Sequence, residues 1–186
     1  TNDNKSEEHE INYRQFNKKL ELLNQILSLI SDINQASDEK EVKDCIPALL
    51  QYTGEYTDAD RVYIFELMSE KQDYYSNTFE WCREGIIPQI DNLIRIPADS
   101  MPVWHEKFLR GETIIIHDLE KIRETMPSEY DILKVQDIHS LLVLPLFANT
   151  QLSGFIGLDN PELVNPGVSI SFLSNAGGHL ASTLNN

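Results

Sequence analysis

The sequence predicts an α+β fold in three layers, with a central antiparallel sheet between terminal helices on one face and short helices and loops on the other. Three observations support this class. Helical periodicity is present at both ends of the chain. Runs rich in Val, Ile, Tyr and Phe occupy much of the middle, and short polar joints between them are typical of hairpins. Short helical segments and an apolar loop separate these runs, which provides a second layer to cover the sheet.

The first 36 residues divide into two parts. Residues 1–15 are polar and acidic, and we expect a disordered or frayed segment there. Residues 16–36 have helical periodicity, and we expect a signalling and dimerisation helix. One apolar stripe on it steps by four, three, four and three residues, which is the spacing of a heptad seam. We expect this seam to form a dimer interface, and its residues are Phe16, Leu20, Leu23, Leu27 and Ile30.

A second stripe on the same helix widens its apolar surface. Leu22, Ile26, Leu29 and Ile33 follow the same steps on a neighbouring face. The outer helix of a monomer could not leave two such stripes in water, so we expect one face to pack on the domain and the other on a partner. The alternative is a helix that lies entirely within its own core.

Residues 37–186 are expected to form a sensory domain that ends in a helix leading to an output domain. Ser37 is a favoured N-cap for a helix, and Glu41 falls near the capping-box position. The runs DRVYIFELM and DYYSNTFEWC, joined by polar SEKQ, predict a β-hairpin. Residues 83–100 are rich in isoleucine although they carry the prolines and glycine of a loop, so they must lie over another element.

The second half of this domain alternates short helices with strands. Pro102 begins a short helix that Gly111 ends, and TIIIHDL is a strand. Pro127 begins another short helix. Residues 140–147 and 152–158 are strands that are apolar on both faces, which predicts central positions in a sheet covered on both sides. Residues 168–186 have the period of a final helix.

Four segments resemble a known family. ADRVYIFEL, SNTFEWCREGI, IPADSMPVWHEKFLRGETIIIHDL and SLLVLPLFANTQLSGFIGLDNP are together similar to a GAF domain, and the last has Pro145, Gly154 and Gly157 where that family has a strand pair. The resemblance covers residues 38–184 and implies a GAF-like three-layer sandwich. The wording EWCREGI and DNP is most similar to GAF domains of bacterial diguanylate cyclase and phosphodiesterase (GGDEF and EAL) signalling proteins.

Charge and cysteine content exclude several classes of function. The formal net charge is -15, and no Lys/Arg cluster offsets it, so the surface repels nucleic acids and anionic membranes. Two cysteines, Cys45 and Cys82, do not make a disulfide framework, which favours a reducing, cytoplasmic setting. No apolar run approaches the roughly 20 residues of a membrane-spanning helix.

Motifs for catalysis or metal binding are weak. No two histidines have the spacing of a zinc site, and no glycine cluster forms a phosphate loop. His105 or His117 could each provide one haem ligand, but a lone histidine is more commonly a packed or surface residue. Some GAF folds reduce methionine sulfoxide through cysteines, but Cys82 has no evident resolving partner. Others attach a bilin through cysteine, and the flanking residues EWCREG do not match.

A binding pocket between the sheet and the middle segments is therefore the main candidate, because small molecules bind there in the GAF family. In strand 74–84, strict alternation places side chains on two faces: Tyr75, Asn77, Phe79, Trp81 and Arg83 on one, and Ser76, Thr78, Glu80 and Cys82 on the other. No cofactor is certain, and the expected ligand is an unidentified small molecule. The alternative is a core filled by its own side chains. The candidate lining residues are Trp81, Cys82, Ile96, Trp104, His117 and Leu144.

We therefore expect a non-catalytic sensory or regulatory domain of a bacterial signal-transduction protein. It would bind a small molecule, form a homodimer through its N- and C-terminal helices, and pass a shift to a cyclic di-GMP output domain outside this chain. Two other functions stay open: a dimerisation spacer with a vestigial pocket, and a cysteine-dependent enzyme resembling a methionine sulfoxide reductase.

Overall fold

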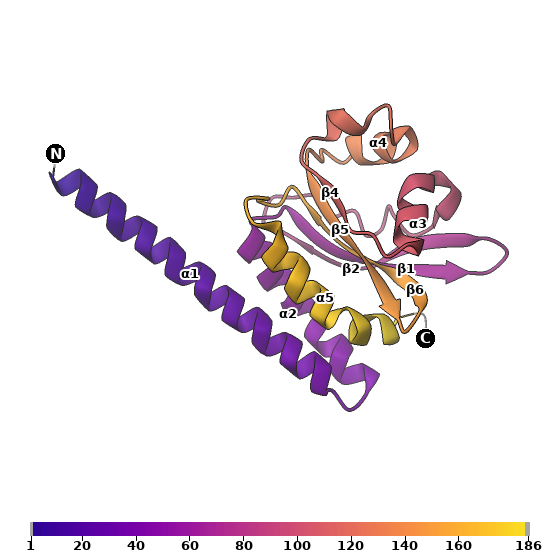
Figure 1. Cartoon of the computed structure of the whole chain (residues 1–186), viewed down its shortest axis with the longest axis horizontal. Helices are drawn as coiled ribbons and strands as arrows, with labels where there is room; N and C mark the ends of the chain where they lie inside the picture. The colour runs from indigo at the N-terminus through magenta and orange to yellow at the C-terminus, as the bar shows by residue number, and fades with distance from the viewer. Residues whose placement is uncertain (1, 185–186) are drawn as a thin grey trace.

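A six-stranded antiparallel sheet forms the centre of the molecule in the computed structural model, which describes residues 2–184 (Figure 1). The strands follow the order β3-β2-β1-β6-β5-β4 across the sheet, so the last strand pair lies between the first hairpin and β4. Their bounds are β1 (Arg61–Ser69), β2 (Asp73–Cys82), β3 (Ile96–Pro97), β4 (Ile114–Ile116), β5 (Leu141–Ala148) and β6 (Gln151–Asp159).

Helices cover both faces of this sheet. The long helices α1 (Asn2–Gln35), α2 (Glu39–Thr57) and α5 (Pro166–Ser182) lie together on one face. The other face carries η1 (Ala98–Ser100), α3 (Pro102–Leu109), η2 (Leu119–Ile122) and α4 (Pro127–Lys134). This arrangement confirms the predicted α+β sandwich of three layers.

Helix α1 is longer than we expected. Residues 2–15 are helical, where the sequence predicts a disordered or frayed segment, and they project from the body of the domain in Figure 1. Every residue from Asn2 to Phe16 is exposed. Lys19 makes a contact with the domain by donating to the Asp58 carboxylate at 2.9 Å, and the buried residues Ile26 and Ile33 hold the C-terminal half of the helix on the core. The first turns therefore continue a helix that is nucleated by packing further along the chain.

The N-cap of α2 lies one residue after the expected position. The Asp38 side chain accepts a hydrogen bond from the Glu41 backbone N–H at 2.9 Å. The Glu41 carboxylate in turn accepts a hydrogen bond from the Ser37 N–H at 2.8 Å. Asp38 extends its backbone at φ -148°, so its carboxylate rather than the Ser37 hydroxyl reaches the first turn.

Two separate cores lie on the two faces of the sheet. Along β5, Leu142 and Leu144 pack under the long helices, whereas Leu141 and Val143 pack under the short helices. All four are buried, as are Ile156 and Phe155 of β6, which also face opposite ways. The two strands are therefore central and apolar on both faces, as the sequence predicts.

A bulge in β2 changes which residues face each core. Ile64 pairs with Phe79, but the next residue, Phe65, pairs with Asn77, so Thr78 has no partner on β1. Strict alternation across this strand is wrong for that reason. Tyr75 and Asn77 lie on the side of the short helices, whereas Phe79 and Trp81 lie against the long helices.

Two glycine substitutions should have opposite effects on stability. Gly154 has φ +156°, and an added Cβ would lie 2.0 Å from the backbone oxygen of Phe65, so Gly154→Ala should lower the free energy of unfolding by about 2 kcal/mol or more. Gly178 is a helical glycine with open space around it, so Gly178→Ala should raise that free energy by up to about 1 kcal/mol. Urea denaturation of both variants measures the two effects. A neutral Gly154→Ala would contradict the close approach of β6 to β1.

Candidate functional site

A small cavity of about 30 Å³ lies between the sheet and the layer of short helices. Its floor consists of β1, β2 and β6 residues, and its roof comes from the 83–96 segment, α3 and the segment around α4. The roof residues Leu93, Ile96, Met101, Trp104 and Ile138 are mostly apolar. A cavity of this size has room for a ligand of only a few atoms. A drug-sized ligand needs a pocket of about 300 Å³ or more.

Aromatic rings form one wall of the cavity. Phe155 of β6 stacks on Phe65 at a centroid distance of 4.8 Å and on Phe108 at 4.9 Å. Trp104 of α3 meets Phe155 edge to face at 6.2 Å. Stacked and edge-to-face pairs of this kind hold their rings in fixed orientations, so this wall is rigid.

The other end of the cavity is polar. Arg61 Nη1 lies 3.2 Å from the Asp159 carboxylate, and the Tyr63 hydroxyl donates a hydrogen bond to the same carboxylate at 2.7 Å. All three side chains are buried. The Arg61 guanidinium also donates to the backbone oxygen of Ile87 at 3.0 Å, which holds the apolar loop against the sheet.

Glu80 anchors the same loop from the strand beneath it. Its carboxylate accepts hydrogen bonds from the backbone N–H of Gln89 at 3.0 Å and of Ile90 at 3.3 Å. The side-chain amide of Asn77 also donates to it at 3.3 Å. Three N–H groups therefore satisfy this carboxylate, and the loop is tied to the sheet through charged groups on both β1 and β2.

Burial shifts the ionisation of this cluster. It raises the pKa of Asp159 to about 6, although hydrogen bonds from Tyr63 and Arg61 oppose the shift. Burial and the neighbouring Asp159 carboxylate raise the pKa of the Tyr63 hydroxyl well above its usual value. Burial, followed by the charge of Glu80, raises the pKa of the Cys82 thiol to about 11. At neutral pH Cys82 is therefore a protonated thiol and a weak nucleophile.

The structure brings two of the six expected pocket residues to this cavity. Ile96 and Trp104 line it. Trp81 lies on the opposite face of the sheet, where its ring contacts α2 so closely that a Cβ on Gly54 would lie 2.0 Å from it. Leu144 also faces the long helices, because it alternates with Val143 along β5. The bulge at Thr78 and the period of two on β5 explain these two corrections.

Cys82 and His117 lie outside the cavity wall. Cys82 is half-buried, and its thiol donates to the Glu80 carboxylate at 3.5 Å. His117 follows β4 and is exposed. His105 is not in the cavity wall either. Its ring Nδ1 lies 2.6 Å from the hydroxyl of Tyr75. In the part of the chain that the structure describes, no group of three or more His, Cys, Asp or Glu residues is placed to hold a metal ion.

Sequence reasoning missed the polar end of the cavity. Arg61 and Asp159 each stand at one end of an apolar strand run, in DRVYIF and GLDNP. They are direct partners in the antiparallel pairing of β1 and β6. The sequence does show opposite charges at the ends of two apolar strands. It does not show that Arg61 and Asp159 lie side by side, because that depends on the register in which β1 pairs with β6.

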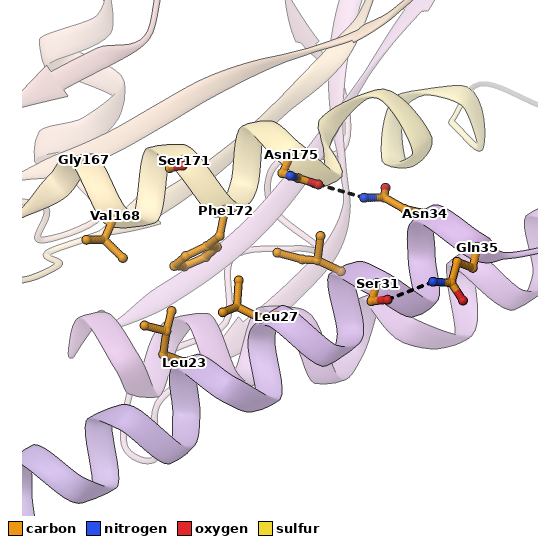
Figure 2. Close-up of a pocket in the computed structure, with 11 residues that line it drawn as sticks. Leu23, Leu27, Ser31, Asn34, Gln35, Gly167, Val168, Ser171, Phe172 and Asn175 are labelled. Atoms are coloured by element: carbon orange, nitrogen blue, oxygen red, sulfur yellow. Dashed lines mark hydrogen bonds between the residues drawn. The ribbon is translucent and has the colours of Figure 1, made fainter.

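A second candidate surface is an open groove along the seam of α1 and α5, shown in part in Figure 2. Leu23 and Leu27 of α1 face Val168 and Phe172 of α5 there, and the Asn34 amide donates to Asn175 at 2.8 Å. This part of the α1–α5 groove measures about 750 Å³. A second part of about 300 Å³ continues from Leu23 toward Phe16, Leu20 and Val164.

The expected dimer seam is partly exposed along this groove. Phe16, Leu20 and Leu27 are 62%, 44% and 49% exposed. Leu23 is half-buried and Ile30 is buried, although both line the groove. The second stripe is divided in the same way, because Leu22, Ile26 and Ile33 are buried and Leu29 is half-buried. One face of α1 thus packs on the domain, and the other remains uncovered within this chain.

Comparison with known proteins identifies similar sequences. A family model described as GAF domain matches residues 41–176. The methanogenesis regulatory histidine kinase FilI of Methanothrix harundinacea (strain 6Ac) is 31% identical over 124 residues, which is 64% of this chain. The chain spans only 14% of the length of that relative.

Solved structures with a similar fold include domains of phytochromes. The phycoerythrobilin-bound GAF domain from a cyanobacterial phytochrome has a TM-score of 0.65 at 16% identity, covering 89% of this chain and 95% of that one. The Stigmatella aurantiaca phytochrome photosensory core module has a TM-score of 0.68 at 16% identity, covering 89% of this chain and 37% of that one. At these identities the likeness concerns the fold.

The raised pKa of Asp159 should make stability depend on pH. A carboxyl whose pKa is higher in the folded state favours folding at low pH, and this contribution is lost as the pH rises through the folded pKa. We expect the free energy of unfolding of the wild type, relative to Asp159→Asn, to fall by up to about 3 kcal/mol between roughly pH 4 and pH 7. Urea denaturation across this range measures it.

The exposed α4 residue Asp131 provides a matched control, since Asp131→Asn changes a carboxylate outside the cluster. Its difference from wild type should not follow the trend of Asp159→Asn. A gap between wild type and Asp159→Asn that grows as the pH rises would mean that the ion pair with Arg61 outweighs burial.

Proposed function

This chain belongs to the GAF domain family, and we propose that it is a sensory domain that binds a small molecule in the cavity beneath α3 and α4. The observation that carries the proposal is the composition of the cavity wall. It combines stacked aromatic rings with the buried ionic cluster of Arg61, Tyr63 and Asp159. Ligand sites are typically apolar hollows with a few placed polar groups, and this wall has both.

The two central strands provide the link from the cavity to the long helices. Tyr63 and Phe65 of β1 line the cavity, while Val62 and Ile64 of the same strand pack in the other core, where α2 contacts β1. On β6, Phe155 and Asp159 face the cavity, and the neighbouring Ile156 and Leu158 face the helices. Because interiors are close-packed, a shift of either strand on one face must be matched by repacking on the other.

We further propose that a second copy of this chain covers the α1–α5 groove. The exposed heptad stripe on α1 continues into apolar residues of α5, so one surface includes helices from both ends of the chain. Such a dimer would let ligand binding bias the packing of the helices, as a population shift between two arrangements. The alternative, a dimerisation spacer, would keep this groove and lose the ligand.

The output belongs to a domain outside this chain. Two classes compete: cyclic di-GMP turnover, which the EWCREGI and DNP wording favours, and a histidine kinase, which is the class of the curated relative. The identity of 31% over 124 residues is the more specific support, so we favour a kinase output. The chain itself is proposed to be non-catalytic, because Cys82 has a raised pKa and Cys45 packs on the opposite face of the sheet.

A covalently held bilin does not fit the residues of this chain. The described cysteines are both free, and neither lines the cavity. The cavity of about 30 Å³ is also far too small for a tetrapyrrole.

None of the helices within residues 2–184 is long and apolar enough to span a membrane.

Thermal shift against a library of small metabolites tests ligand binding. A compound at 100 times its Kd should raise the Tm of the wild type by roughly 5–10 °C. Ile96→Phe places extra volume in the cavity and should remove this shift. Ile94→Phe adds the same volume two residues away, at a side chain 58% exposed, and should keep it. If no compound distinguishes the two variants, the cavity is not a sensory site.

Sedimentation equilibrium tests the dimer. Leu20→Glu combined with Leu27→Glu places charges on exposed positions of the groove and should weaken self-association by about 100-fold or more, since each leucine contributes about 1.5–3 kcal/mol when buried. Val135→Glu introduces the same charge at a residue that is 84% exposed near α4, and the dimer should survive. A wild type that is monomeric at high concentration would remove the proposed dimer.

A further inference from the structure

The wall of the cavity is buried except along one side. Its lining residues on β1, β6 and α3 are all buried. The half-buried lining residues lie in β2 and β3, in the segment between these strands, and around the end of α4. They are Glu80, Gln89, Leu93, Ile96, Ile132 and Gln136. The cavity therefore comes closest to solvent between the 86–94 segment and the end of α4.

Residues 86–94 pack weakly on the domain. None of them belongs to a helix or a strand, and none is buried. Ile87 is 72% exposed, and only half-buried residues such as Leu93 reach the core. Segments with few buried contacts open locally at a lower cost in free energy than the rest of a domain.

The two helices of the roof are held more firmly than this segment. Trp104 and Phe108 of α3 are buried, and so are Tyr130 and Leu133 of α4. Phe108 also stacks on Phe155 of the sheet at a centroid distance of 4.9 Å. Moving either helix would expose these side chains to water, so the 86–94 segment is the part of the roof that moves at least cost.

Polar bonds attach the middle of the segment to β2. The Glu80 carboxylate accepts hydrogen bonds from the backbone N–H of Gln89 at 3.0 Å and of Ile90 at 3.3 Å. The backbone N–H of Asn77 donates to the oxygen of Leu93 at 2.9 Å. Hydrogen bonds to an ionised acceptor are the stronger kind, so Glu80 provides the main attachment.

Arg61 joins the two sides of the place where the cavity is nearest to solvent. Its Nε donates to the backbone oxygen of Ile87 at 3.0 Å on one side, and its Nη1 lies 3.5 Å from the backbone oxygen of Gln136 on the other. The ion pair with Asp159 holds the guanidinium between them. One buried side chain thus ties the 86–94 segment to the residues that follow α4.

The two ends of the segment differ in how firmly they are held. Gly85 has φ +86°, and an added Cβ there would meet no atom within 4 Å, so this end has the free backbone of a hinge. At the other end, Arg95 pairs with Glu70 at 2.9 Å, and its guanidinium carbon lies 3.9 Å from the centroid of the Tyr74 ring. The pairing of β3 with β2 fixes the chain directly after Arg95.

We propose that residues 86–94 are a lid through which small molecules enter the cavity, hinged at Gly85 and held shut by Glu80 and Arg61. This inference rests on the proposed function, because it assigns the entry route to the same cavity. Opening breaks the bonds from the lid to these two charged side chains and leaves the buried faces of α3 and α4 in place.

Thiol labelling inside the cavity tests the lid. Ile138→Cys places a thiol in the buried wall of the full chain, with Cys45→Ala and Cys82→Ser removing the native thiols. Methyl methanethiosulfonate is a small uncharged reagent, and its rate of reaction with this thiol reports how often the cavity opens. We expect the rate to change little in low urea, because opening the lid exposes little surface. Leu142→Cys in the other core should react more slowly, through global unfolding.

Two Glu80 variants and a matched control identify what holds the lid. Glu80→Ala removes both oxygens that accept from the lid, so it should speed the labelling of Ile138→Cys relative to Leu142→Cys by about tenfold or more. Taking this ratio removes the effect of any loss of global stability. Glu80→Gln keeps one acceptor oxygen and should give a smaller rise. Glu84→Ala removes an exposed carboxylate next to the hinge and should leave the ratio unchanged.

The outcomes separate the lid from the proposed function. A ratio that does not rise in Glu80→Ala would overturn the lid. Labelling of both cysteines at one rate with Glu80 intact would also overturn it, because the cavity would then open only on global unfolding. Either result leaves ligand binding to the comparison of Ile96→Phe with Ile94→Phe. Failure of every compound in that comparison would remove the binding function, whereas the labelling ratio would still show whether residues 86–94 open.

Discussion

A sheet buried on both faces is the constraint on which this molecule depends. Each central strand must divide its side chains between two cores that have different tasks. On β1, Val62 and Ile64 serve the layer of long helices, and Tyr63 and Phe65 serve the layer of short helices. A change in the position of one strand is therefore felt in both layers at once, and it would reach α1 through α2 and α5, on which α1 packs.

The main role of the buried ionic cluster is to position the loop over the cavity, and it need not stabilise the fold. Replacing a buried ion pair by apolar residues is often neutral or stabilising, so Arg61 and Asp159 are weak evidence of extra stability. What they do in the structure is geometric. Arg61 holds the loop oxygen of Ile87, and Glu80 holds the N–H groups of Gln89 and Ile90, so an apolar loop stays closed over the cavity. Opening this roof would break charged hydrogen bonds, which links access to the cavity with the ionisation of the cluster.

The two candidate surfaces differ in kind. The cavity is small, lined by aromatic rings and bordered at one end by the Arg61–Asp159 ion pair. The α1–α5 groove is larger, open and lined by partly exposed leucine, valine and phenylalanine side chains. The first has the character of a site for a small ligand, and the second has that of a surface for another helix. Their separation by the sheet means that a ligand and a partner can act on the domain together.

The sequence by itself determined the layers, the order of the elements and the apolar stripes of α1, because helical and strand periodicities are local properties. The hairpin of β1 and β2 and the two-sided burial of β5 and β6 were predicted for the same reason. Only the tertiary structure decided which pocket residues meet. The bulge at Thr78 moved Trp81 to the far face, and the register of β1 on β6 joined Arg61 to Asp159. Register and bulges arise from pairing between distant segments, so no local pattern contains them.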